Sequence, residues 1–190
     1  MSSQPITYLT PEEYLAIERK AEYKNEYLDG AVVAMTGASR KHNLITLNIA
    51  REISRQLRGR PCEAYANDMR VRVPSTRLYT YPDVAVVCGE PQFEDDFVDT
   101  LLNPTLIVEV LSESTEAYDR GKKFGLYRTI ESLAEYLLVA QDEYRIEQYV
   151  KQPDGRWLLS DYRTLDDVVE LTSIQCQLAL QEVYDKVALP

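Results

Sequence analysis

Two carboxylates stand inside segments that otherwise have the apolar pattern of buried β-strands. Asp83 lies in the segment Tyr81–Val87, and Glu109 lies in Thr105–Leu111. Strand alternation places each carboxylate on a face that it shares with apolar neighbours. A buried carboxylate is costly unless it is neutralised, paired or bound to a cation. Both positions are therefore candidates for chemistry, although either acid alone is also explained by a loop cap or by an ion pair with a core arginine.

A divalent metal is the cation that best suits this pair. Consecutive strands are often neighbours in a sheet, so Asp83 and Glu109 are expected to converge. Mg²⁺ prefers oxygen ligands, uses one or two carboxylates and keeps several of its waters. We therefore expect Mg²⁺ as the cofactor, with Mn²⁺ as the alternative metal.

The spacing that follows Glu109 predicts a lysine at the same place. A strand from Glu109 to Ser112 advances about 10 Å, and a helix from Thr115 to Lys123 that packs back over the sheet retreats about 12 Å. These lengths nearly cancel, so the ammonium of Lys123 returns to the level of Glu109. Lys122 would point about 100° away around the same helix. The ordinary alternative is a surface lysine.

Two carboxylates, a metal ion and a lysine suit the hydrolysis of phosphodiester bonds. The metal would polarise a phosphoryl oxygen and activate water, while the lysine would orient that water or stabilise developing negative charge. The residue types thus predict a nuclease.

The distribution of charge gives this nuclease a place to hold phosphate. The protein has a net charge of -10, which argues against indiscriminate binding to a polyanion. Residues 40–77 nevertheless carry nine basic and three acidic side chains. A helix start is already favourable for anions, and the basic helix expected here begins near residue 40. The candidate substrate-binding residues are His42, Arg40, Lys41, Arg51 and Arg55.

Periodicity and turn residues predict an α/β or α+β fold in which these side chains are carried by a sheet and its flanking helices. No linker or repeat divides the chain, so residues 1–190 are expected to form a single domain. Helices are predicted over residues 10–20, 39–59, 112–130 and 178–184. In the second, the four-residue spacing of Ile45, Ile49, Ile53 and Leu57 predicts the face that packs on the core. Strands are predicted over residues 26–35 as a hairpin, 62–65, 69–73, 79–88, 104–111, 135–140, 144–151 and 157–162.

The ordered motifs of this chain resemble those of the Uma-two family, which belongs to the PD-(D/E)XK nuclease superfamily. The motifs run from Glu26-Tyr27-Leu28-Asp29-Gly30 through Tyr81-Pro82-Asp83 and Glu109-Val110-Leu111-Ser112 with Ser114-Thr115 to Asp119-Arg120-Gly121-Lys122-Lys123 with Tyr127. The resemblance implies a restriction-endonuclease-like fold, a mixed central β-sheet flanked by helices. It implies metal ligands at Asp83, Glu109 and the Val110 carbonyl, and an outer catalytic acid at Glu26.

One departure from the superfamily pattern concerns the catalytic lysine. The superfamily usually has a lysine two residues beyond the second acid, and here Leu111 occupies that position. Within the Uma-two family the lysine comes from the following helix, which matches Lys123. The displaced lysine and the acidic surface keep a second interpretation open, a catalytically silent nuclease-fold module that binds nucleic acid or a protein partner. A third, a carboxylate-pair hydrolase acting on sugars, would need its carboxyl groups about 5–5.5 or 6.5–9.5 Å apart.

The composition also indicates the location of the protein and the role of its cysteines. Apolar runs are too short for a membrane span, and the first residues have no apolar targeting core, so a cytoplasmic location is expected. The three cysteines, Cys62, Cys88 and Cys176, are too few for a disulfide framework. We interpret them as small core residues. The expected substrate is DNA, and the protein is expected to be a homodimer because cleavage of both strands needs two sites or two events.

Overall fold

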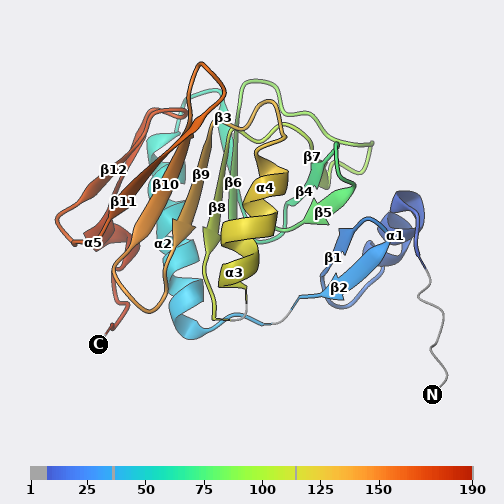
Figure 1. Ribbon diagram of the computed structural model, residues 1–190, viewed down its shortest axis with the longest axis horizontal. Coiled ribbons are helices and arrows are strands. Elements are labelled where there is room, and N and C mark those ends of the chain that lie inside the picture. Colours follow the sequence, from blue (N-terminus) through green and yellow to red (C-terminus); the bar gives the residue numbers. More distant parts are fainter. Residues whose placement is uncertain (1–7, 36, 114, 190) are drawn as a thin grey trace.

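A six-stranded mixed sheet is the central element of this α+β fold (Figure 1). The computed structural model describes residues 8–35, 37–113 and 115–189, so Ser114 of the serine–threonine motif and the first seven residues lie outside the described residues. The strand order is β11-β10-β9-β8-β6-β3, and only β8 and β9 are parallel neighbours. Its strands are β3 (Cys62–Ala66), β6 (Val84–Cys88), β8 (Leu106–Val110), β9 (Glu135–Val139), β10 (Ile146–Lys151) and β11 (Trp157–Tyr162). The predicted mixed sheet flanked by helices is confirmed.

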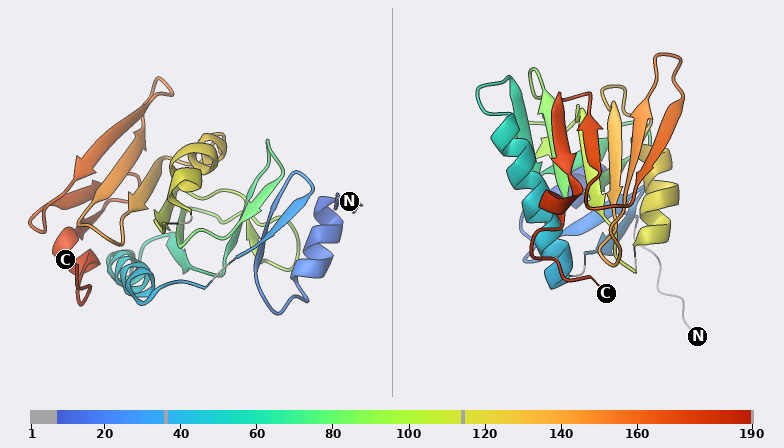
Figure 2. Two further views of the ribbon diagram at one scale, coloured as in Figure 1. Left: turned by 60° about the horizontal axis from the view of Figure 1, so that its bottom comes forward. Right: turned by 90° about the vertical axis from the view of Figure 1, so that its left-hand side faces the viewer.

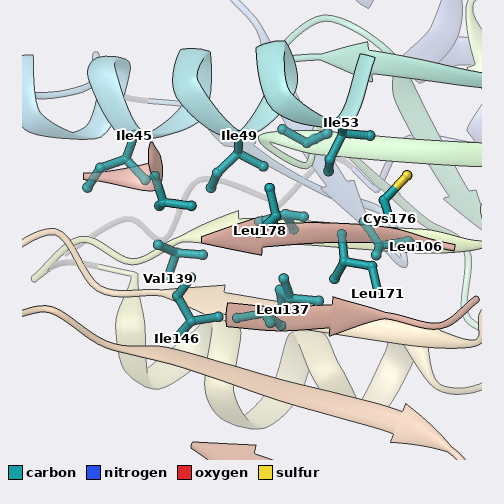
Figure 3. Close-up of a cluster of buried hydrophobic side chains, with 14 of the residues drawn as sticks. Ile45, Ile49, Ile53, Leu106, Leu137, Val139, Ile146, Leu171, Cys176 and Leu178 are labelled. Carbon is teal, nitrogen blue, oxygen red and sulfur yellow. The ribbon is translucent and has the colours of Figure 1, made fainter. Parts of the chain in front are cut away.

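Helix α2 (Arg40–Gln56) covers one face of this sheet (Figure 2). Its stripe of Ile45, Ile49 and Ile53 is fully buried, as the four-residue spacing predicted. Figure 3 shows these side chains over the apolar side chains of the sheet and of the C-terminal hairpin. That hairpin, β12 (Val168–Leu171) with β13 (Cys176–Ala179), leads into the short helix α5 (Leu180–Val183). The main core therefore lies between α2, the sheet and the C-terminal segment.

The opposite face is covered by the connection between β8 and β9 (Figure 2). Two parallel neighbouring strands need such a crossover, and it consists of α3 (Glu116–Tyr118), the π-helical turn η1 (Asp119–Lys123) and α4 (Phe124–Tyr127). The helix predicted over residues 112–130 is thus shorter than expected. It is also interrupted by the π turn, in which the Phe124 amide donates to the Asp119 carbonyl. Insertions of this kind occur frequently at functional sites.

A second, five-stranded sheet lies beside the first (Figure 1), with the strand order β2-β1-β5-β4-β7. Its strands are β1 (Asn25–Leu28), β2 (Ala31–Ala34), β4 (Arg70–Val73), β5 (Leu78–Thr80) and β7 (Thr100–Leu101), and α1 (Pro11–Glu18) packs against it. The predicted hairpin is confirmed as β1–β2. Asp29 and Gly30 form its turn with φ of 44° and 95°, the left-handed conformations that a two-residue hairpin turn requires.

The strand predicted over residues 79–88 is in fact two strands in two sheets. β5 ends at Thr80 in the smaller sheet, and β6 begins at Val84 in the larger one. Pro82 lies in the break, and proline cannot donate a hydrogen bond to a strand partner. Asp83 therefore lies at the junction between the sheets, just before β6, and the expectation that it is part of a continuous strand was wrong.

The loop of residues 89–103 is partly built into the fold. It contributes β7, in which Leu101 is fully buried. Arg19 in the segment after α1 holds the same loop through ion pairs with Asp95 and Asp99, each at 2.8 Å. No helix in the described part of the chain is both long and apolar enough to cross a membrane.

Two of the cysteines form a disulfide, contrary to the expectation that all three are simple core residues. Cys62 at the start of the edge strand β3 is bonded to Cys88 at the end of β6, where the two residues are register partners. The two cysteines are 26 residues apart in the sequence, and they become neighbours only because β3 pairs with β6. Cys176 is a free, buried thiol, as expected.

This cross-link is expected to stabilise the protein. Closing a loop of this length in the unfolded chain corresponds to about 3 kcal/mol, so the Cys62→Ala/Cys88→Ala variant should lose about that amount in urea unfolding. Thiol titration in denaturant should find one reactive thiol before reduction and three after it. Three reactive thiols in the unreduced protein would contradict the assignment.

Candidate active site

Glu109 and Lys123 form a buried ion pair at the end of the larger sheet. Glu109 belongs to β8 and Lys123 ends the π turn of the crossover, and Lys123 Nζ lies 2.9 Å from Glu109 Oε1. Both residues are about 95% buried. The return of the chain over the sheet therefore brings the lysine to the level of the acid, as the strand and helix rises predicted.

Two further carboxylates surround the ammonium group of Lys123. Glu26 from β1 of the smaller sheet contributes Oε1 at 3.1 Å, and Asp119, one turn earlier in the crossover, contributes Oδ1 at 3.6 Å. Glu26, predicted as an outer acid, is thus brought into the cluster. The cluster joins the hairpin, β8 and the crossover in one set of contacts.

Burial and charge change the proton affinities in this cluster. Burial raises the pKa of Glu109 to about 8; the nearby Lys123 opposes this rise, while Asp119 and Asp83 reinforce it. Burial likewise raises the pKa of Asp119, with Lys123 opposing. Burial alone would lower the pKa of Lys123, but Glu109, Glu26 and Asp119 outweigh it and raise that pKa well above its usual value. The lysine is therefore held in its charged form.

Asp83 lies at the neighbouring strand, but it contacts the backbone and a histidine instead of Lys123. The Val110 amide donates to Asp83 Oδ2 at 2.7 Å, and His42 Nε2 lies 3.4 Å from the same oxygen. Burial disfavours the charged form of His42, but Asp83 and the Val110 carbonyl outweigh it and raise the pKa of His42. The single histidine of the chain is thus fixed between two of the predicted metal ligands.

The donor set fits a divalent metal that keeps most of its own water. Among the described residues, no three His, Cys, Asp or Glu side chains are arranged as a complete metal cage. Lys123 and Tyr127 both contact Glu109 Oε1. Within the described ranges, Glu109 Oε2 and Asp83 Oδ1 have no hydrogen-bond or ion-pair partner. Two carboxylate oxygens and a backbone carbonyl are ligands that suit Mg²⁺.

Sequence reasoning missed three residues of the cluster. Tyr127 entered the sequence analysis only within a motif, yet its hydroxyl donates to Glu109 Oε1 at 2.8 Å and lies 3.4 Å from Thr80 Oγ1. Thr80 in turn donates to Glu26 Oε1. Asp119 was quoted only as part of a motif. The signal for Asp119 and Tyr127 is their spacing of four residues on either side of Lys123, which places all three on one side of a helix.

The predicted phosphate-binding residues fall into two groups. Arg40 and Lys41, at the start of α2, line a cavity of about 730 Å³ together with Leu111 and Ser112, which follow Glu109 along the chain. The same cavity is also lined by four acidic residues: Glu113, Glu116, Asp142 and Glu143. Arg51 and Arg55 lie farther along α2, where both pair with Glu52. The structure brings His42, Arg40 and Lys41 to the end of the sheet that carries the acids, and it places Arg51 and Arg55 away from it.

The hydroxyl of Tyr127 is expected to contribute to stability. The Tyr127→Phe variant leaves a buried carboxylate with one donor fewer, so its free energy of unfolding should fall by about 1–2 kcal/mol. Tyr149→Phe is the matched control, because the Tyr149 hydroxyl has no hydrogen bond within the described part of the chain and its ring packs against Phe124. Equal effects of the two variants in urea unfolding would contradict the assigned bond.

The raised pKa of Glu109 predicts how stability changes with pH in the presence of a chelator. Between its usual pKa of 4.5 and about 8, the folded protein keeps a proton that the unfolded chain has lost. Stability therefore falls as the pH rises through this range. The Glu109→Gln variant lacks this titration, so the wild type should lose stability relative to it between pH 5 and pH 8. A difference that stays constant with pH in urea unfolding would contradict the shift.

Sequence comparisons with known proteins identify the family of this chain. Residues 11–181 match the sequence model of the family described as "Uma2: Putative restriction endonuclease". An uncharacterized protein of Synechocystis sp. is 42% identical over 153 residues, which is 80% of this chain and 86% of that protein. A second from the same organism is 40% identical over 182 residues, which is 96% of this chain and 94% of that protein.

A crystal structure provides the comparison at the level of the fold. It is described as a "putative nuclease belonging to DUF820" from Anabaena variabilis, with a TM-score of 0.76 and coverage of 95% of this chain and 99% of that chain. At 17% identity this likeness concerns the fold alone. The sequence match extends over most of the chain, from α1 to α5, and the protein therefore belongs to the Uma2 family.

Proposed function

We propose that this protein is a Mg²⁺-dependent endonuclease that hydrolyses phosphodiester bonds of DNA. The observation that carries the proposal is the contact of Lys123 Nζ with Glu109, 2.9 Å away and buried, at the sheet end where Asp83 precedes the neighbouring strand. The nuclease family and the nuclease-like fold support the same conclusion. The choice of DNA follows from the resemblance to restriction endonucleases.

Asp83, Glu109 and the carbonyl of Val110 would hold the metal. When bound, Mg²⁺ supplies Lewis-acid polarisation of the scissile phosphate and favours deprotonation of water. Mn²⁺ has the same preference for oxygen ligands and is the alternative metal. Tyr127 and Lys123 fix one oxygen of Glu109, which leaves the other to face the metal.

Lys123 is the residue that we assign to the reacting phosphate. Its ammonium stays protonated beside three carboxylates, so it can donate hydrogen bonds to an attacking water and stabilise the negative charge that develops on the phosphoryl oxygens. Glu26 and Asp119 hold the ammonium in place. Glu26 is also the more exposed of these carboxylates, with 16% of its side chain accessible, and we assign it the role of an outer acid that contacts water.

The start of α2 provides the first contacts to the substrate backbone. His42 lies beside Asp83, and Arg40 and Lys41 precede it at the start of α2. Positive side chains and the free amides of a helix start both favour phosphate. Arg51 and Arg55 extend the basic surface along the helix.

The proposal also includes a quaternary state and a cellular location for the protein. A double-strand break needs two active sites or two successive events, so we propose a homodimer. We retain the cytoplasm as the proposed location, where a structural disulfide such as Cys62–Cys88 is unusual.

Substitutions at the cluster are expected to abolish cleavage while the fold remains. Asp83→Ala, Glu109→Ala and Lys123→Ala should each lower the rate of DNA cleavage in Mg²⁺ by about 100-fold or more, the usual effect of losing an electrostatic or acid–base group. The rate is measured on a labelled duplex, and circular dichroism verifies that each variant is folded.

Two exposed residues provide matched controls for this experiment. Lys122→Ala removes the neighbouring lysine, which points to solvent, and Asp96→Ala removes an exposed acid from the loop of residues 89–103. Both variants should cleave at the rate of the wild type. Wild-type cleavage that persists in excess chelator would overturn the proposal. Binding of nucleic acid without any hydrolysis in Mg²⁺ or Mn²⁺ would instead favour the catalytically silent module.

A further inference from the structure

A basic groove lies between the second half of α2 and the edge strand β3, away from the carboxylate cluster. It encloses about 830 Å³, and its walls are formed by Arg51–Arg60 on one side and Cys62–Tyr65 on the other. Four arginines line it: Arg51, Arg55, Arg58 and Arg60. Residues 40–60 carry six basic side chains and one acidic side chain in a protein of net charge -10.

Two of these charges are not neutralised within the described part of the chain. Arg60 donates to the carbonyls of Ile174 and Gln175 at 2.6 and 3.1 Å, which fixes the guanidinium without cancelling its charge. Neither Arg60 nor Arg58 has a described carboxylate within 4.0 Å. The groove therefore presents permanent positive charge to a ligand from outside the chain.

The two elements beside the groove, α2 and β3, both extend from it towards the candidate active site. β3 runs antiparallel to β6, with Cys62 opposite Cys88 and Ala66 opposite Val84. The chain after β3 reaches the carboxylate cluster directly, since the Asn67 amide donates to the Asp83 carbonyl at 3.0 Å. The other wall reaches the same place, because α2 begins next to His42, which contacts Asp83.

The dimensions of the groove fit a chain of phosphates better than a single phosphate. Along α2, from His42 beside Asp83 to Arg55 in the groove, the helix rises by about 20 Å, a length that about six nucleotides span along a duplex. Arg51 and Arg55 are separated by about 6 Å along the helix axis, and Arg58 and Arg60 follow just after the helix. Arginine contacts to phosphate position a nucleic acid without reading its sequence.

We propose that this groove binds the sugar–phosphate backbone of the nucleic acid that flanks the position to be cleaved. This inference rests on the proposed nuclease function and adds the path of the substrate: from the cluster at Asp83, between α2 and β3, to Arg58 and Arg60. Arg55 at the end of α2 and Arg58 in the turn after it, both exposed, contribute phosphate contacts along this path.

The test compares two double variants in the binding of a labelled 20-base-pair DNA duplex in excess chelator, so that cleavage plays no part. Arg55→Gln/Arg58→Gln removes two groove charges. Arg156→Gln/Arg163→Gln is the matched control, because it removes two exposed charges in and beside the hairpin of β10 and β11, at the opposite edge of the same sheet. Thermal unfolding verifies that both variants are folded.

The groove variant should bind at least tenfold more weakly than the wild type by fluorescence anisotropy. Its plot of log K against log salt concentration should be less steep by about two, since each lost phosphate contact lowers the slope by about one. The control should bind nearly as the wild type does. Equal losses in the two variants, or no loss in the groove variant, would overturn the inference.

Two further outcomes separate this inference from others. In one, a mononucleotide displaces the labelled duplex at lower concentration than an unlabelled duplex does, and it does so only when Arg58 is present. That result would assign the groove to a small phosphorylated ligand and overturn the inference. Arginine-dependent binding in a protein that does not cleave in Mg²⁺ would support the groove and reject the nuclease proposal. Cleavage in Mg²⁺ together with unchanged binding in the groove variant would support the nuclease proposal and reject the groove.

Discussion

The buried contact between Glu109 and Lys123 is the interaction on which the rest of this structure depends. Neither charge is tolerable alone in an apolar interior, and removing one partner of such a pair typically costs about 3–5 kcal/mol. Each residue therefore constrains the element that carries it: the end of β8 and the last turn of η1 must face one another. The crossover can satisfy this constraint only when it lies back across the sheet.

The π turn η1 carries Lys123, one of the two residues of this contact. It places Asp119 and Lys123 on the same buried side, although most of the intervening residues face outward. Tyr127 then reaches Glu109 from the next turn. The break at Pro82 has a comparable role, because it moves the chain from one sheet to the other and leaves Asp83 at their junction. Both irregular features lie at the cluster, where local geometry departs from the regular pattern of the surrounding elements.

Much of this arrangement follows from simple periodicities. The apolar pattern around Glu109 and the rises of strand and helix were enough to predict its meeting with Lys123. The stripe of Ile45, Ile49 and Ile53 predicted which face of α2 is buried. The rest depends on contacts between distant segments. Nothing local to Cys62 or Cys88 reveals that β3 pairs with β6, and the polar partners of Tyr127 come from two strands in two different sheets. A single strand over residues 79–88 was predicted because its apolar pattern outweighed the signal of one proline.

Because of Glu26, the cluster is assembled from segments that lie far apart along the chain. It reaches Lys123 from the N-terminal hairpin, while Asp83, Glu109 and Lys123 come from later parts of the chain. Only a fragment that spans residues 26–123 contains the whole set, and a nascent chain has Glu26 long before it has Lys123. The centre comes into existence only when both sheets have docked, so a partly synthesised or partly unfolded copy carries no assembled centre.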